Sequence, residues 1–423
     1  MNIVCKLTVL TLALASATVA RKASRAFAER PLREYPMKLR EDMRGEADIS
    51  PVASEIARYH WPTLPAMQAE RTQLPLRISI LDYRRPGAPL ATMTTGMTPM
   101  FTRGNTQGPV ETFLRYSADG RRLLAYDGAG IVHVFGLENP EPHEIRIITL
   151  GLSPERPNFQ PVDMEWSPDS GRVAVLFSFR NFHEGVVRVY DAGTGERRWE
   201  RSVNRVEMGR EAWSPDGRKL AVTLLSGQGY NSTSVSYEIP ARDMFNLVIL
   251  DSTSGRLLQR IMTKDLAGPV CFGPDNSVLT APLHAGPTNR NLFAPERVKV
   301  WDATSGKLVR KIASPGRDIH NQLAVSRNGK VLLGYVGKEK VGFVLHDLEV
   351  EAMVLDRRFQ LFDYESGEVI ATSPDLTKAG EGADQMPSRL DPVTPSLRLS
   401  PDGRRVLVYW PSRAYGPSVF ELQ

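Results

Sequence analysis

The stretch Trp213-Ser214-Pro215-Asp216-Gly217 is one of six related copies of a short motif in this sequence of 423 residues. Each copy places an aromatic or aliphatic residue before a tight polar corner. The copies begin at Tyr116, Trp166, Trp213, Phe272, Val325 and Leu399. Their second residues are separated by 50, 47, 59, 53 and 74 positions. This recurrence indicates repeats of one structural unit.

The composition of the corner has a physical reason. Pro215 fixes φ and cannot extend the preceding strand. Asp216 can accept hydrogen bonds from nearby backbone amides, and Gly217 tolerates a positive φ. Each copy therefore predicts a hairpin turn. We disfavour a metal role for the aspartates, because they occur once per repeat on separate turns instead of clustering.

The flanking residues read as strands. Apolar residues alternate before most corners, as in Leu114/Tyr116, which is the period of a β-strand. A second strand follows each corner, and a third often ends in an Asp-x-x-Ser/Thr-Gly turn, as at residues 191–195 and 302–306. A short fourth strand comes next. Four strands in a unit of roughly 40–60 residues form the blade of a propeller.

The sequence therefore predicts an all-β fold, a β-propeller of four-stranded antiparallel blades. Six corners require at least six blades. Residues 76–83 and 89–93 look like a third and a fourth strand without a first and a second, and we expect them to complete a blade opened by the C-terminal strands. We predict seven blades, with six as the alternative.

The pairing of Ser-Pro-Asp-Gly corners with Asp-x-x-Ser/Thr-Gly turns resembles the bacterial WD-repeat-like propellers, including the TolB-like group. The resemblance covers residues 76–423 and implies a repeat propeller. Only Trp301-Asp302 is a true Trp-Asp pair, and the Gly-His element of eukaryotic WD repeats is missing. The partners of WD repeats are therefore not carried over.

The N-terminus has the form of a secretory signal peptide over residues 1–20. Its apolar run, residues 7–15, is too short to span a bilayer as a helix, and small residues follow it. We expect a periplasmic or secreted protein, with an uncleaved anchor or a wrong start codon as alternatives. Residues 21–75 are predicted to be an extension or linker that could touch a membrane surface. No later segment predicts a transmembrane helix.

The charge argues against a nucleic-acid partner. The formal net charge is +5, of which Lys6 supplies one unit and residues 21–46 three, which leaves about +1 for the rest. Neutralising phosphates requires a basic stripe, and none is evident. Cys5 lies in the expected leader. Cys271 stands in an apolar strand, where we predict a small buried hydrophobe without disulfide or reactive role.

The sequence contains no catalytic signature. A G-x-S-x-G elbow, a phosphate-binding glycine loop and paired metal-ligand histidines or cysteines are all missing. We predict no catalytic residue, metal or cofactor. The alternative is an enzyme, either a quinoprotein-like dehydrogenase or a hydrolase, with its site on loops of one face.

Residues 191–199 resemble the Asp-x-x-Thr-Gly-x-x-x-Trp docking motif of quinoprotein-type propellers. Gln259, Arg310 and Ala371 stand where the other three turns would carry the tryptophan. The pattern favours one structural tryptophan, Trp199, over a quinone site.

The favoured function is a non-catalytic binding or protein-interaction scaffold, monomeric, with a protein, small molecule or glycan as ligand. Turns between first and second, and third and fourth, strands are short and lie on one face. Connections between second and third strands open on the other face and are long, including one over residues 336–356. Aromatic and arginine side chains on such loops suit binding, and neutral insertions are the alternative. The candidate binding residues are Phe179, Arg180, Phe182, His183, Tyr230, Tyr237, Arg242, His284, Arg290 and Phe293.

Overall fold

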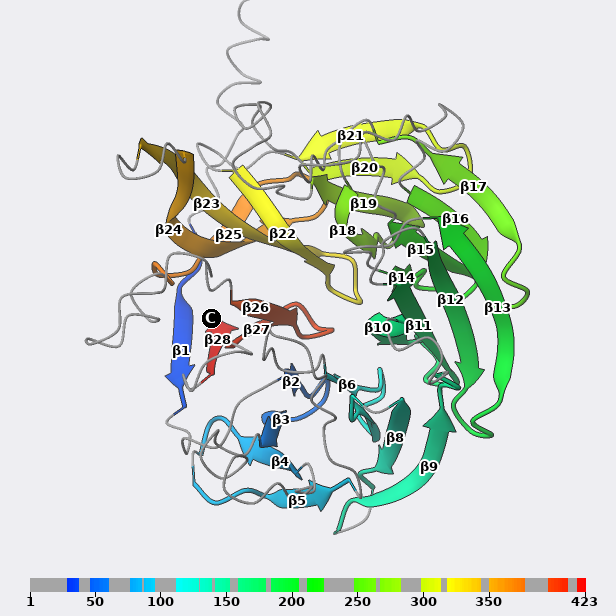
Figure 1. Ribbon diagram of the computed structural model, residues 1–423. Helices are drawn as coiled ribbons and strands as arrows, with labels where there is room; N and C mark the ends of the chain where they lie inside the picture. The colour runs from blue at the N-terminus through cyan, green and yellow to red at the C-terminus, as the bar shows by residue number, and fades with distance from the viewer. Residues whose placement is uncertain are drawn as a thin grey trace, which may run out of the picture.

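A computed structural model gives the fold (Figure 1). It describes residues 29–37, 46–60, 77–85, 87–95, 112–128, 130–138, 141–152, 159–179, 184–204, 211–223, 247–263, 267–282, 298–312, 318–343, 350–376, 395–409 and 417–423. The expected signal peptide, residues 1–20, lies outside these ranges.

Within these ranges the chain forms 28 strands in seven four-stranded antiparallel sheets and no helix. The sheets stand around a common axis as the blades of a propeller (Figure 1). The predicted fold and the choice of seven blades over six are confirmed. Within the described ranges, no helix is long and apolar enough to cross a membrane.

The strands are numbered along the chain, and blades 1 to 7 follow the order of their first strands. The first strands are β2 (Ala47–Ile49), β6 (Phe113–Tyr116), β10 (Phe159–Trp166), β14 (Glu211–Trp213), β18 (Ala267–Phe272), β22 (Asp318–Val325) and β26 (Ser396–Leu399). The second strands are β3 (Glu55–His60), β7 (Arg122–Tyr126), β11 (Arg172–Phe179), β15 (Lys219–Thr223), β19 (Ser277–Pro282), β23 (Val331–Phe343) and β27 (Arg405–Tyr409). The third strands are β4 (Arg77–Asp82), β8 (Ile131–Gly136), β12 (Glu184–Asp191), β16 (Leu247–Asp251), β20 (Val298–Asp302), β24 (Val350–Asp363) and β28 (Ser418–Leu422). The fourth strands are β5 (Ala91–Thr94), β9 (His143–Thr149), β13 (Arg197–Asn204), β17 (Leu257–Ile261), β21 (Leu308–Ile312), β25 (Val369–Thr372) and β1 (Leu32–Pro36).

The first strands form the inner ring. Each contacts the first strand of the next blade, and β26 contacts β2, so the ring is closed. They surround the centre of the view in Figure 1, with the fourth strands at the rim. Each first strand is the inner edge of its sheet, and the close packing of the ring shields that edge from another chain.

The ring is closed by the N-terminal segment, and this corrects two expectations. Strand β1 pairs with β28, so the residues that complete the last blade are 32–36. The strands over residues 77–82 and 91–94 instead belong to blade 1, together with β2 and β3. The expected start of the propeller at residue 76 is therefore too late. Blade 1 has its own corner at Ser50-Pro51, where the Ser50 N–H donates to the Glu55 carbonyl at 2.9 Å. It lacks the Asp or Asn that each of the other six corners carries two residues after its serine or glycine.

The core lies between blades. Each sheet presents apolar side chains on both faces, and these pack against the adjacent sheets. Between blades 2 and 3, for example, Tyr126 and Val134 pack with Met164, Val175 and Phe177, all of them buried. Burying one such side chain contributes roughly 1.5–3 kcal/mol. This repeated packing makes the inner ring a rigid platform.

The corners have the predicted turn chemistry. In blade 4 the Ser214 hydroxyl donates to Asp216 at 2.6 Å, and the Gly217 N–H donates to the Ser214 carbonyl at 2.8 Å. Gly217 has a φ of 69°. Partial burial opposes ionisation of Asp216, but the bonds from Ser214 and Arg218 outweigh it and lower the pKa of the carboxyl. The carboxylate of Asp216 therefore accepts its hydrogen bonds from residues of its own turn.

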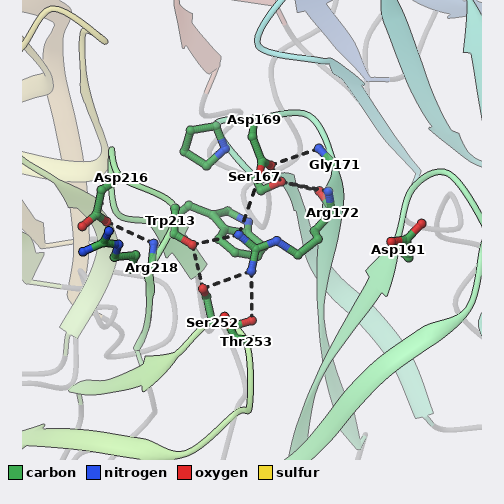
Figure 2. A network of polar contacts seen from close by, with 12 residues as sticks. Ser167, Asp169, Gly171, Arg172, Asp191, Trp213, Asp216, Arg218, Ser252 and Thr253 are labelled. Carbon is green, nitrogen blue, oxygen red and sulfur yellow. Dashed lines mark hydrogen bonds and ion pairs between the residues drawn. The ribbon is translucent and has the colours of Figure 1, made fainter.

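Arginines tie neighbouring blades together on the corner face (Figure 2). Arg172 of blade 3 donates to the Gly217 carbonyl at 2.9 Å and to the Ser252 hydroxyl at 3.1 Å, both in blade 4. Its guanidinium also lies 4.8 Å from the centre of the Trp213 ring. Arg405 does the same between blades 7 and 1, donating to the Ala53 carbonyl at 2.6 Å.

One expected connection is mostly strand. Residues 336–356 were expected to be a long link between a second and a third strand. Instead, β23 and β24 continue pairing from Lys338↔Leu355 to Phe343↔Val350, beyond a bulge after Val336. The blade therefore extends as a two-stranded ribbon, labelled β23 and β24 in Figure 1, at the ends of these strands away from the corner.

Candidate functional site

Each blade presents one inner-strand residue to the axis. It stands two positions before the corner serine, or before Gly273 in blade 5. In chain order these residues are Asp48, Arg115, Glu165, Ala212, Cys271, Ala324 and Arg398. Their neighbours along the strand, such as Leu114 and Tyr116, are buried between blades, and side chains alternate along a strand. The seven positions therefore lie on the other side of the inner strands, where Ala212, Cys271 and Ala324 also pack in part against the cores between blades.

The residues at these seven positions fall into two groups, one charged and one small. Blades 7, 1, 2 and 3 carry Arg398, Asp48, Arg115 and Glu165, which we call the charged arc. Blades 4, 5 and 6 carry three small residues, which we call the small arc: Ala212, Cys271 and Ala324.

Arg115 is the centre of the charged arc. Its side chain is only 4% exposed and ion-pairs with carboxylates of blades 1 and 3. Nη1 lies 2.7 Å from Glu46 Oε1, Nε lies 3.1 Å from Glu165 Oε1, and Nη2 lies 3.7 Å from Asp163 Oδ1. One guanidinium thus joins three blades.

Arg398 extends the network to blade 7. Its Nη2 lies 2.6 Å from the same oxygen of Glu46, and its Nε lies 3.9 Å from Asp48 Oδ1. The other oxygen of Asp48 accepts the Tyr116 N–H at 2.7 Å. Four consecutive blades are therefore connected through charged side chains around the axis.

The carboxyl groups of the network are not equally stabilised as anions. Burial would raise the pKa of Glu46, but Arg115 and Arg398 outweigh it and hold that pKa below its usual value. Burial raises the pKa of Asp48, and Arg398 and Arg115 offset it only in part. Burial likewise raises the pKa of Glu165, which Arg115 counteracts and Asp163 reinforces. Of these three carboxyl groups, Glu46 is therefore the one whose ionised form the arginines stabilise most.

The small arc is reached by solvent. Ala212, Cys271 and Ala324 are half-exposed although they lie within innermost strands. The thiol of Cys271 is less buried than expected. Burial still raises its pKa to about 12, so the group is a poor nucleophile.

Arg327 crosses the axis on the corner face. It occupies the proline position of the blade 6 corner, and its guanidinium donates to the Ala118 carbonyl at 3.2 Å and the Pro168 carbonyl at 3.0 Å. Those carbonyls belong to the corners of blades 2 and 3, on the opposite side of the ring. Its backbone N–H donates to the Pro401 carbonyl of blade 7 at 2.7 Å. This end of the axis is therefore spanned by Arg327.

The predicted binding residues lie almost entirely outside the described residues. Phe179 is the last residue of β11, and only its backbone is described; β12 begins at Glu184. The other nine are Arg180, Phe182, His183, Tyr230, Tyr237, Arg242, His284, Arg290 and Phe293. The structure does not bring these side chains together or separate them, and they stay a prediction.

Trp199 has the predicted structural contact, and two other fourth-strand residues share it. Its Nε1 donates to the Ser252 carbonyl of blade 4 at 2.8 Å. At the matching position Gln259 donates to the Thr304 carbonyl of blade 5 at 3.1 Å, and Arg310 donates to the Tyr364 carbonyl of blade 6. Three side chains of different chemistry thus make one tie between blades, which is the packing role expected of Trp199.

The charged arc was missed in the sequence, although a signal for it was present. Arg115, Glu165 and Arg398 each stand between two apolar residues just before a corner. A charged side chain flanked in this way points away from the core in which its two neighbours are buried. Glu46 and Asp48 had no such signal, because their corner lacks the Asp and Gly that marked the repeat.

Among the described residues, no group of three or more His, Cys, Asp or Glu side chains is arranged to hold a metal ion. No protein-family model matches the chain, and no curated protein matches it.

Proposed function

We propose that this protein is an exported, non-catalytic propeller that holds a ligand at the open end of its axis. The observation that carries the proposal is the charged arc, in which ion pairs join side chains of four blades beside the partly exposed residues of the small arc. Charged groups brought together in a concave, rigid frame are typical of binding sites.

The two faces support this choice of position. On the corner face the aspartates are used in their own turns and Arg327 spans the axis. The opposite face carries the connections between second and third strands, where the predicted aromatic and arginine residues would flank the ligand. Loops on a rigid scaffold are the usual place for such contacts. Membership of the bacterial WD-repeat-like or TolB-like propellers, and a monomeric state, belong to this proposal.

The test is retention of a ligand by the intact protein. Wild-type protein is dialysed against a small-molecule extract, washed and denatured, and the released compounds are identified by mass spectrometry. A bulky residue in the small arc, Ala324→Trp, should abolish the enrichment. The matched control is Ser202→Trp, which places the same side chain on the exposed rim strand β13.

Equal enrichment by Ala324→Trp and wild type would contradict the axial site, as would no enrichment by wild type. Thermal unfolding shows whether Ala324→Trp is folded, and Ala212→Leu is the smaller substitution if it is not. Export is tested separately by mass spectrometry of the mature N-terminus, expected near Thr18 or Arg21. Cytosolic protein that retains Met1 would refute it.

A further inference from the structure

His133 lies between two carboxyl groups within blade 2. Its side chain is only 4% exposed, and it belongs to the third strand of the blade, β8. Its Nδ1 lies 2.5 Å from Glu144 Oε2 on the rim strand β9, and its Nε2 lies 3.6 Å from Asp127 Oδ2. Asp127 is fully buried directly after β7, whereas 36% of the Glu144 side chain is exposed. The three side chains therefore connect the outer three strands of the blade.

This arrangement suits an imidazolium better than a neutral imidazole. A neutral imidazole has one N–H donor and one nitrogen that can only accept, and an ionised carboxylate can only accept as well. Asp127 interacts with other groups too, but His133 has just two nitrogens and both face carboxyl oxygens. With a proton on each nitrogen, both contacts are attractive. With a single proton, a lone pair of the ring faces an anion in a poorly hydrated place.

The other groups around His133 add no charge to this balance. Its strand partners in β7 and β9 and the stacked ring of Phe135 are apolar. Blade 1 contributes Tyr59, whose hydroxyl donates to the Tyr126 carbonyl at 3.0 Å, beside Asp127. Burial raises the pKa of Tyr59 well above its usual value, so this hydroxyl stays neutral. Among the described residues, the proton on His133 is therefore governed by the two carboxyl groups.

Loss of that proton should loosen the turn that joins β7 to β8. Burial would lower the pKa of His133, but the hydrogen bonds and charges of Asp127 and Glu144 outweigh it and raise that pKa. The resulting stabilisation is present below the unfolded pKa and is lost as the pH rises through the folded one. The remaining proton stays on Nδ1, next to the nearer Glu144, and the bare Nε2 then faces Asp127. Because Asp127 Oδ1 accepts the Ile131 N–H at 3.3 Å, repulsion of this carboxylate acts directly on the turn.

We propose that Asp127, His133 and Glu144 form a proton-dependent clasp, which fastens the turn between β7 and β8 to the rim strand in acid and releases it as the pH rises. This turn is a connection between a second and a third strand, at the end of the blade away from the corner. The Leu150 N–H, just after β9, donates to the Gly130 carbonyl at 2.9 Å, so the turn is also joined to the end of the rim strand. Such a clasp regulates the blade itself and does not depend on a ligand at the axis.

The test is amide hydrogen exchange of the full chain, read by mass spectrometry and corrected for the intrinsic exchange rate. The measurements run from about pH 5.5 to about pH 9, which includes the charge change of a histidine with a raised pKa. In the wild type, protection around Ile131 should fall by at least roughly fivefold at the higher pH, the change expected for loss of one hydrogen bond. The corner of blade 4 should keep its protection.

Two variants distinguish a clasp from a histidine that only packs. His133→Gln cannot take up a proton, so protection of the turn should not depend on pH. Glu144→Gln introduces an amide that can donate to Nδ1, so a neutral imidazole can keep its proton on Nε2, toward Asp127. This variant should therefore keep the turn protected at high pH, a gain that packing alone would not give. The matched control is His143→Gln, which removes an exposed histidine of the same rim strand and should behave like the wild type.

Several results would overturn the proposal. One is protection of the wild-type turn that does not change with pH. Another is an equal loss of protection at the corner of blade 4, which would indicate general loosening. A third is a pH dependence that survives in both His133→Gln and Glu144→Gln, or one that disappears in His143→Gln. Thermal unfolding shows whether His133→Gln is folded, and Glu144→Gln, at the partly exposed end of the clasp, decides if it is not.

Discussion

The charged arc and the small arc occupy equivalent positions in blades of the same architecture. Arg115 and Glu165 lie two residues before their corners, and so do Ala212 and Ala324. Blades 4, 5 and 6 have the same four antiparallel strands without a charge at this position. Folding of a blade therefore does not require a charged residue there.

This difference indicates that the charged residues of the arc are not needed for the propeller to fold. Desolvating ionised groups costs free energy, and apolar residues in the same place are often equally stable or better. The ties that recur in several blades, such as those of Arg172 and Trp199, instead join blade to blade. Substitutions in the two arcs should consequently have very different effects.

The largest effect is expected from Arg115→Ala. It leaves Glu46, Asp163 and Glu165 without their shared cation at a site only 4% exposed, and breaking such a buried pair costs about 3–5 kcal/mol. Urea unfolding measures the loss. Ala212→Ser in the small arc is the control and should change stability by less than about 1 kcal/mol. Equal losses would remove the distinction between the arcs.

The sequence was sufficient for the repeat, the turn chemistry and the number of blades, because each blade depends on local corner residues such as Ser214, Asp216 and Gly217. It was insufficient for ring closure. The pairing of β1 with β28 joins the two ends of the chain, and nothing in residues 32–36 alone indicates that partner. The axial network depends on the same long-range geometry. Arg327 was visible as a departure from proline, but its partners across the ring were not.

Within the charged arc, Glu46→Gln and Glu165→Gln should differ. The lowered pKa of Glu46 means that its stabilisation is present above the unfolded pKa and is lost as the pH falls through the folded one. Glu46→Gln should therefore cost about 1–3 kcal/mol at neutral pH, and less in acid. Urea unfolding at several pH values measures this.

The raised pKa of Glu165 makes stability depend on pH in the opposite direction. The folded state holds that proton more tightly, so stability falls as the pH rises through the window above the unfolded pKa. Glu165→Gln should flatten this fall and change neutral-pH stability by less than about 1 kcal/mol, since the group is partly exposed. A larger loss for Glu165→Gln than for Glu46→Gln would mean that the arginines are shared differently.

A smaller effect is expected where Arg327 links the two arcs across the axis. Arg327→Ala removes the bonds to the Ala118 and Pro168 carbonyls. Because Arg327 is exposed, the expected cost is about 1–2 kcal/mol. Amide hydrogen exchange should rise at the corners of blades 2 and 3 and stay unchanged at the corner of blade 4. Faster exchange around the whole ring would indicate general loosening instead of loss of a cross-axis link.

The smallest effect, and the most direct probe of the axis, is the reactivity of Cys271 in the small arc. Its side chain is partly exposed, and the burial of the rest raises the pKa of the thiol to about 12, so only a small fraction is thiolate at neutral pH. A methanethiosulfonate reagent that carries a quaternary ammonium should react faster than a sulfonate of the same size, because the partly exposed carboxylate of Glu165 attracts cations. At about 10 Å in a water-like dielectric, one excess unit charge changes the energy of each reagent by about 0.4 kcal/mol in opposite directions, which gives a rate ratio of roughly fourfold. Glu165→Gln should bring that ratio closer to one, whereas the rim substitution Glu200→Gln should leave it unchanged.

The protein for this measurement carries Cys5→Ser, so that Cys271 is its single thiol. Equal rates for both reagents in the wild type would show that the charged arc exerts no net negative field on the small arc, and the electrostatic difference between the two would then be confined to their direct contacts.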